Sequence, residues 1–150
     1  MSNLNKSRES YSIKEISWKQ AQTALRHIRQ QVFVIEQQVP AALEWDGLDE
    51  HAIHLLAQDS EGNAIGCARI LAGSSIGRMA VIKDWRGRGV GHALLQAALA
   101  CCRARNWLQV SLSAQTHALT FYQQAGFKIC SEEYLDAGIP HRDMKLELTN

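Results

Sequence analysis

The stretch Arg86-Gly87-Arg88-Gly89-Val90-Gly91 joins an apolar segment, residues 76–82, to a run of helical periodicity, residues 90–104. Glycines allow successive backbone N–H groups to turn toward one point. The helix that follows adds unpaired N–H groups and the positive end of its dipole. The stretch therefore predicts a strand, an anion-binding loop and a helix in succession, with a pyrophosphate as a fitting ligand.

Two other glycine-rich phosphate loops do not fit this spacing. A P-loop ends in Gly-Lys-Ser/Thr, whereas His92 follows the last glycine here. A dinucleotide fingerprint has its third glycine where His92 stands and needs an acidic residue about 20 positions later. No acid occurs between Asp84 and Glu132. The remaining alternatives are an ordinary glycine-rich turn and the pattern Arg-x-x-Gly-x-Gly, formed by Arg86, Gly89 and Gly91.

The Arg-x-x-Gly-x-Gly pattern resembles the acetyl-CoA pyrophosphate loop of the GNAT family of N-acetyltransferases. Residues 118–127 resemble the same family's short helix that ends at a glycine before a strand. Residues 32–40, the Glu44-x-Asp46-x-x-Asp49 loop and residues 138–144 resemble a small bacterial ElaA-like subgroup. The resemblance implies a GNAT fold. This is an α/β fold with a central mixed, mostly antiparallel sheet of about seven strands, a splayed parallel pair and helices on both faces.

Apolar periodicity independently predicts alternating strands and helices. Strands are expected at residues 11–16, 52–57, 64–72, 76–82, 108–113, 128–134 and 142–148, and helices at 18–35, 89–105 and 116–125. Ser17 is expected to cap the first helix, and residues 59–63 have the composition of a hairpin turn. This order predicts a mixed sheet covered by helices.

Length and composition indicate one domain, residues 11–150, after a polar tail, residues 1–10. The resemblance implies that this is an acetyltransferase domain. The chain has 150 residues, 46% of them hydrophobic, and a net charge of +1. No dense cluster of Lys and Arg favours nucleic acid as a partner. No apolar run is long enough for a membrane span, and the tail lacks a signal-peptide core. We therefore expect a cytoplasmic protein without membrane or nucleic-acid partners. The family resemblance allows a homodimer.

The resemblance also implies where acetyl-CoA binds. The backbone of the strand before the loop is expected to contact pantetheine while the loop surrounds the pyrophosphate, although the same strand residues also suit a plain core. The implied cofactor residues are Met79, Ala80, Val81, Arg86, Gly87, Arg88, Gly89, Val90, Gly91, His92, Phe121 and Tyr122.

The implied reaction is direct attack of an amine on the acetyl thioester. Tyr122 resembles the family's general acid, which protonates the leaving thiolate; alternatively it only packs beside Phe121. A backbone N–H of residues 79–81 is expected to hold the oxyanion. An ammonium must lose a proton before attack, so a base is needed. Its candidates are Glu36, Glu44, Asp46, Asp49, His51 and His141, of which we favour Glu44 and His141.

Several alternatives remain open from the sequence. Each acid of residues 44–50 is otherwise expected in a solvated loop, or the loop binds a cationic amine by charge. His141 is otherwise a surface or acceptor-site residue. The domain as a whole is either an N-acetyltransferase acting on a small-molecule or peptide amine, or a non-catalytic acyl-CoA sensor or regulatory domain of the same fold.

Metal and thiol chemistry are not expected. Asp49, His51 and His54 lie close in sequence, but the two histidines would point to opposite faces of a strand, so no metal site is predicted. The cysteines lack a C-x-x-C spacing and are expected to be buried free thiols. They are Cys67, Cys101, Cys102 and Cys130.

Overall fold

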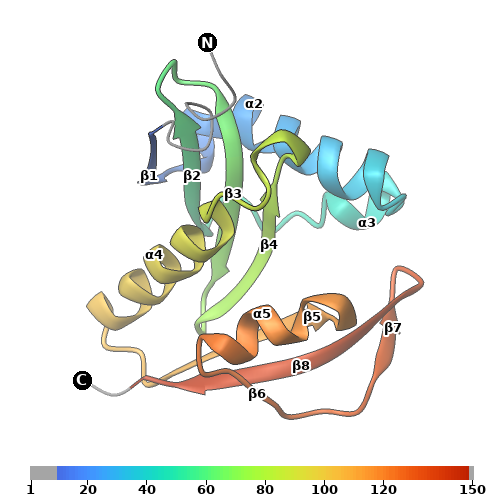
Figure 1. Ribbon diagram of the computed structural model, residues 1–150. Coiled ribbons are helices and arrows are strands. Elements are labelled where there is room, and N and C mark those ends of the chain that lie inside the picture. The colour runs from blue at the N-terminus through green and yellow to red at the C-terminus, as the bar shows by residue number, and fades with distance from the viewer. Residues whose placement is uncertain (1–9, 149–150) are drawn as a thin grey trace.

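The computed structural model describes residues 10–148, which form one eight-stranded sheet with helices on both faces (Figure 1). The strand order is β1-β2-β3-β4-β5-β8-β6, and β7 pairs with β8. All neighbours are antiparallel except β4 and β5. The predicted tail lies outside the described residues except for Ser10. Within residues 10–148, no helix combines the length and the apolar character that a membrane span requires.

The elements follow the predicted alternation. The strands are β1 (Tyr11–Ile16), β2 (Ile53–Asp59), β3 (Ala64–Leu71), β4 (Ser75–Val81), β5 (Gln109–Gln115), β6 (Lys128–Ile129), β7 (Tyr134–Asp136) and β8 (Ile139–Glu147). The helices are α2 (Trp18–Arg29), the π-helix η1 (Gln30–Glu36), α3 (Ala41–Glu44), α4 (Val90–Ala104) and α5 (Leu119–Gln124), with 3₁₀ turns η2 (Lys83–Trp85) and η3 (Thr116–Ala118).

The first predicted helix is confirmed, but it changes type along its length. The Ser17 hydroxyl accepts from the Gln20 N–H at 3.2 Å, which confirms the expected cap. Beyond Arg29 the chain continues as η1, whose wider turn is shown by the Gln37 N–H donating to the Val32 carbonyl. π-turns often occur at functional sites, and this one directs Phe33 and Gln37 toward a cleft described below.

The prediction for residues 128–134 as one strand is wrong. β6 ends at Ile129, and polar Ser131 interrupts the alternation; its hydroxyl accepts from the Asp143 N–H at 2.8 Å. The chain then returns as β7 and turns back through Ala137 and Gly138, which both have positive φ, as a two-residue hairpin requires. The last strand thus begins at 139 rather than 142, and the sheet has eight strands rather than about seven.

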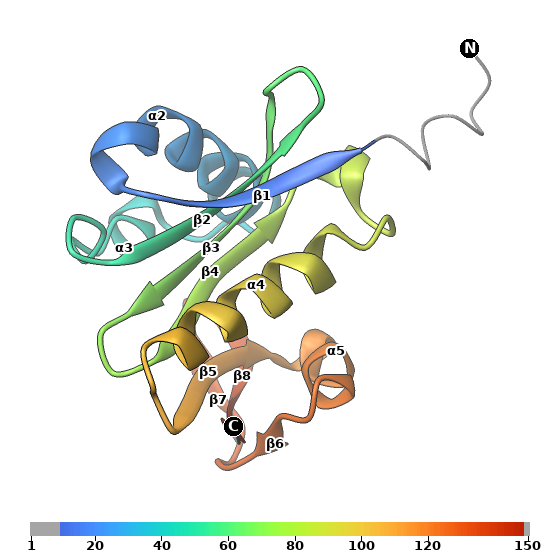
Figure 2. The ribbon, with the colours of Figure 1, turned by 90° about the vertical axis from the view of Figure 1, so that its left-hand side faces the viewer.

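The two faces of the sheet are covered by α2 and α4, which Figure 2 shows on opposite sides of β1–β4. The amphipathic face of α2 packs on Leu56 and Cys67, and α4 buries Leu94 and Leu95 over the other face. Gly66 of β3 permits close approach of α4, because a Cβ there would lie 3.0 Å from Leu94 Cδ1. The same Cβ would lie 3.0 Å from a backbone carbonyl oxygen of β4.

β4 and β5 form the splayed parallel pair that the sequence predicted. Only Ser75 with Ser111 and Ile76 with Leu112 are paired, after which the strands diverge. In Figure 1, β4 and β8, the antiparallel neighbour of β5, run in clearly different directions. The divergence leaves backbone groups of both strands facing an open wedge.

We expect Gly66→Ala to lower the free energy of unfolding by about 1–3 kcal/mol, because overpacking at the α4 interface forces side chains or backbone to shift. Denaturant unfolding monitored by circular dichroism measures it. Gly77→Ala is the matched control, since a Cβ at Gly77 meets nothing within 4 Å. Equal losses for the two variants would contradict the close packing of α4 on β3.

Candidate active site

A cleft of about 450 Å³ occupies the wedge between β4 and β5. Residues 75–79 of β4 form one wall, and residues 113–115 of β5 with His141 of β8 form the other. Tyr122 of α5 and residues of η1 and α3 complete the lining. A hydrogen bond of 2.7 Å from Gln115 Nε2 to Gln37 Oε1 joins the β5 wall to the end of η1.

A β-bulge shapes the β4 wall. Cys67 pairs with Ala80 and Arg69 with Gly77, so β4 has one more residue than β3 over this stretch. Arg78 lies in the bulge with φ of +46°, an uncommon value for a residue with a side chain. The buried Cys67 thiol donates to the Arg78 carbonyl at 3.3 Å, which holds the bulge from behind. Burial raises the pKa of this thiol to about 12, so it remains a donor.

Tyr122 reaches the cleft from α5. Its ring lies edge-on to Phe121 and Phe127, with centroid distances of 5.0 and 5.9 Å. Its hydroxyl lies 3.8 Å from the Met79 sulfur, a weak acceptor, beside the bulge. Burial raises the pKa of Tyr122 to about 12, so the phenol is protonated at neutral pH. The ring therefore packs beside Phe121 while Tyr122 also lines the cleft, and its role as general acid stays a prediction.

The glycine loop forms the start of α4. Gly87 and Gly89 have φ of +77° and +84°, values that side chains rarely adopt. Gly89 is the N-cap of α4, and no side chain caps the first turn. The Val90 side chain is buried in the core, and its N–H belongs to that uncapped turn. This loop therefore presents backbone donors and a helix dipole, the groups that a pyrophosphate requires.

The cationic side chains of the loop already have partners. Arg86 donates from Nε to the Val81 carbonyl at 2.9 Å and from Nη2 to Glu36 at 2.8 Å. The Arg88 guanidinium lies 4.7 Å from the centroid of the Trp85 ring. Arg86 thus ties the loop to η1.

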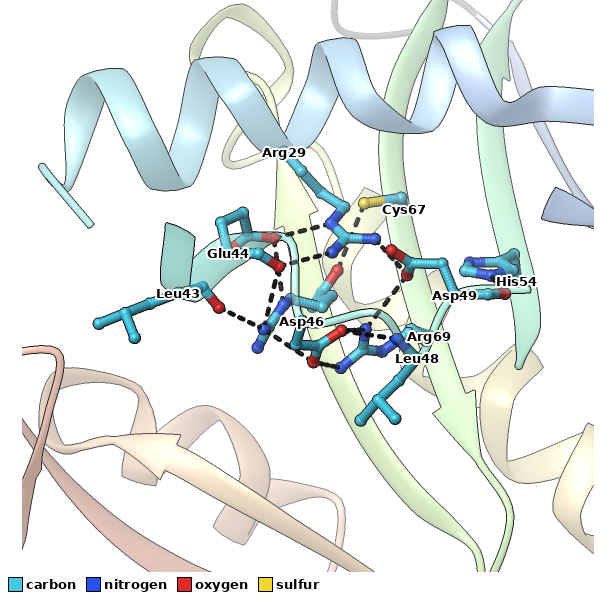
Figure 3. Close-up of polar contacts among 10 residues, drawn as sticks. Arg29, Leu43, Glu44, Asp46, Leu48, Asp49, His54, Cys67 and Arg69 are labelled. Carbon is cyan, nitrogen blue, oxygen red and sulfur yellow. Dashed lines mark hydrogen bonds and ion pairs between the residues drawn. The ribbon is translucent and has the colours of Figure 1, made fainter. Parts of the chain in front are cut away.

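Three arginines form ion pairs with three carboxylates of the loop of residues 44–49 (Figure 3). Arg29 of α2 contacts Glu44 at 2.7 Å through Nε and Asp49 at 2.6 Å through Nη1. Arg69 of β3 contacts Asp46 at 2.8 Å through Nη2 and Asp49 at 3.1 Å through Nη1. The formal charges of this arginine network sum to zero.

Arg78 joins the same network from the bulge. Its Nη2 lies 3.1 Å from Asp46 Oδ2 and donates to the Leu43 carbonyl at 3.3 Å. Its Nε lies 3.1 Å from Glu44 Oε2, the distance of an ion pair, but the N–H is not aligned as a hydrogen bond. The contacts connect the 44–49 loop to the wall of the cleft.

Burial and guanidinium contacts oppose each other at these carboxylates. Burial raises the pKa of Glu44, and Arg29 and Arg78 offset this only in part. Burial also acts to raise the pKa of Asp46, but hydrogen bonds from Arg69 and the Leu48 N–H outweigh it and lower the pKa to about 2. The pKa of Asp49 is lowered for the same reason, with Arg29 and Arg69 overcoming burial.

The solvated acidic loop expected from the sequence is therefore wrong for two of its residues. Glu44 is 3% exposed and Asp49 is 7% exposed. The alternative that the loop binds an amine by charge is not supported either, because Glu44, Asp46 and Asp49 are all paired with arginines. Glu44 still lines the cleft, between the network and the open space.

His141 lies on the opposite wall and is only 8% exposed. Its Nδ1 is 2.7 Å from the Ile139 carbonyl oxygen, which can only accept, so Nδ1 carries the proton. The Tyr134 ring stacks on the imidazole at 6.1 Å. Within residues 10–148, Nε2 has no hydrogen-bond partner, so this nitrogen is open to a ligand in the cleft.

The chain belongs to the GNAT acetyltransferase family. A family model described as an acetyltransferase (GNAT) domain matches residues 9–148. The chain is 37% identical over 122 residues to the uncharacterized N-acetyltransferase YjcF of Bacillus subtilis, covering 79% of this chain and 86% of that protein.

Two solved structures support the assignment. The crystal structure of Escherichia coli ElaA has a TM-score of 0.82 and 30% identity, with 91% of this chain and 99% of that chain covered. An acyl-CoA N-acyltransferase from Pseudomonas aeruginosa has a TM-score of 0.77 and 35% identity, with coverages of 91% and 98%. The GNAT fold and the ElaA-like resemblance predicted from the sequence are confirmed.

The remaining base candidates, Glu36 and His51, do not line the cleft, and neither does the neighbouring His54. His51 is exposed in a turn, and Glu36 pairs with Arg86. His54 donates from Nε2 to the Asp49 carbonyl at 2.8 Å and packs on Trp18. In the described part of the chain, no group of three or more His, Cys, Asp or Glu is arranged to hold a metal ion.

The cysteines differ from one another in burial. Cys67 and Cys102 are buried, Cys101 is partly buried and Cys130 is exposed, so the expectation of burial is wrong for Cys130. Its strand ends one residue earlier, which places the side chain on the surface.

Sequence reasoning missed the arginines and the β7 residues of the site. Arg69 lies within an apolar strand and Arg29 on the apolar face of α2. A charge buried in an apolar run requires a partner, and the acidic stretch was the available one. For Tyr134 and Asp136, no comparable signal was present, because β7 is exposed and short.

We expect Arg29→Met to lower the free energy of unfolding by about 3–5 kcal/mol, because it leaves two buried carboxylates without their main partner. Denaturant unfolding at neutral pH measures the loss. Arg26→Met, one turn earlier in α2, is the control; it removes cation–π contacts with Trp18 and Trp45, worth about 1 kcal/mol. Comparable losses for both variants would argue against a structural role of the network.

Proposed function

We propose that this GNAT protein transfers the acetyl group of acetyl-CoA directly to a primary amine of a small molecule or peptide, within a ternary complex. The observation that carries the proposal is the convergence of three kinds of groups on one cleft. The β4 backbone at the bulge, the Tyr122 hydroxyl and the His141 imidazole all line the same space. The β4 backbone suits the carbonyl oxygen of the thioester, the Tyr122 hydroxyl suits the leaving sulfur, and the His141 imidazole suits the attacking amine.

The features of the glycine loop support acetyl-CoA as the donor. The uncapped start of α4 suits the pyrophosphate, and the wedge between β4 and β5 suits the pantetheine arm. Acetyl-CoA supplies the acetyl group as a thioester that an amine can attack. We infer that a backbone N–H of residues 79–81 stabilises the charge that develops on the carbonyl oxygen. Met79 of this segment lines the cleft, and one such donor is typically worth about 3 kcal/mol.

His141 is the favoured base. Its Nδ1 is held by the Ile139 carbonyl, so Nε2 accepts the proton that the attacking ammonium must lose. Glu44 also lines the cleft, but Arg29 and Arg78 contact its carboxylate, which supports a structural role instead. The nitrogen–carbon bond forms as the carbon–sulfur bond breaks, and the sulfur leaves with the electron pair of that bond.

Tyr122 is the favoured acid. Its hydroxyl faces the cleft beside Met79, and the phenol holds its proton at neutral pH. It donates this proton to the leaving thiolate. The second proton that the nitrogen loses as the amide forms restores the phenol by way of solvent, and the proton taken up by His141 is released to solvent. The same desolvation that raises the pKa of the phenol also raises the pKa of a thiol beside it, so burial does not by itself widen the gap between the proton donor and the proton acceptor.

We expect Tyr122→Phe to lower kcat about 100-fold while acetyl-CoA affinity changes less than about twofold, because a general acid acts in the transition state. Release of the CoA thiol across a panel of amines measures kcat, and calorimetry measures affinity. Tyr11→Phe removes the same hydroxyl beside Gly89 of the glycine loop and outside the cleft lining, so it controls for loss of a hydroxyl near the cofactor and should retain kcat.

Two outcomes would contradict the proposal. Acetyl-CoA binding without turnover on any amine would favour the sensor function. Absence of acetyl-CoA binding would overturn the interpretation of residues 86–92 as its pyrophosphate loop.

A further inference from the structure

The cleft has one acidic side chain that the network does not neutralise. Arg69, Arg78 and Glu44 line the cleft, but each has an oppositely charged partner within the arginine network. Asp136 also lines the cleft, at the end of β7. Among residues 10–148 it forms no ion pair. The cleft therefore has an excess negative charge on its β7–β8 side.

The β7–β8 hairpin fixes Asp136 relative to His141. Tyr134 is paired with His141 and Asp136 with Ile139, so Asp136 and His141 share a face as diagonal neighbours. Such neighbours lie about 7–8 Å apart. The hairpin turn, Ala137 and Gly138 with φ of +53° and +77°, is tight and leaves little freedom in this spacing.

Independent evidence for a ligand on this face comes from the imidazole. His141 is more than nine-tenths buried, yet its Nε2 has no hydrogen-bond partner in the described chain while it lines the cleft. The ring cannot turn away, because Tyr134 stacks on it and the Ile139 carbonyl holds Nδ1. The Tyr134 hydroxyl is itself fixed by Asp143 and Ser113.

We propose that the acceptor carries a second cationic group, which Asp136 binds while His141 Nε2 faces the nitrogen that attacks. The acceptor class is then a short diamine or an amine with a comparable second cation, rather than a simple monoamine. This inference rests on the proposed function for the role of the attacking nitrogen. The binding of the second cation by Asp136 does not depend on acetyl transfer.

The test compares putrescine with butylamine, which has the same carbon chain and one ammonium. Calorimetric titration into the CoA-loaded protein is expected to show about fivefold tighter binding of putrescine, the contribution of one partly exposed ion pair. Asp136→Asn should reduce that preference to less than about twofold and leave butylamine affinity unchanged. Asn suits the same turn position, so the variant should fold.

Glu133→Gln is the matched control, since it removes one negative charge from the same segment outside the cleft lining. The Glu133→Gln variant should still bind putrescine about fivefold more tightly than butylamine. Equal binding of the two amines by the wild type, or equal weakening of both by Asp136→Asn, would overturn the inference. A preference that depends on Asp136 without turnover of any amine would uphold the subsite and reject acetyl transfer. Turnover of monoamines with no preference for the diamine would uphold acetyl transfer and reject the Asp136 subsite.

Discussion

The early divergence of two parallel strands is the constraint on which the site depends. β4 and β5 share only two residue pairs, and beyond them the backbone groups of both strands face a space instead of each other. Unpaired backbone groups are costly when buried, so such a wedge is stable only where solvent or a ligand occupies it. The bulge at Arg78 and the packing of α5 then decide which atoms face that space.

The arginine network explains how the divergent geometry is held. Arg29, Arg69 and Arg78 come from α2, β3 and β4, and all three contact carboxylates of one short loop. Buried ion pairs add little net stability compared with apolar packing, but breaking one is expensive. The network thus favours a single position of the loop relative to the bulge, which connects Glu44 at one side of the cleft to the β4 wall.

Local sequence patterns predicted the elements that depend on short-range chemistry. The positive φ angles at positions 87 and 89 favour glycine, and the start of α2 favours a capping residue such as Ser17. Both features could be predicted from the neighbouring residues. The contacts of Glu44 could not, because its partners lie 15 and 34 residues away in sequence. The division of residues 128–136 into two short strands was missed since their pairing is set by β8 rather than by their own apolar pattern.

Backbone hydrogen exchange with and without acetyl-CoA tests most directly the claim that the wedge and the start of α4 form one cofactor site. The account predicts that acetyl-CoA slows exchange at residues 79–81 of β4 and at residues 90–92 of α4 together, and leaves the paired strands β1 and β2 unchanged. Protection at only one of these two segments, or at neither, would contradict it.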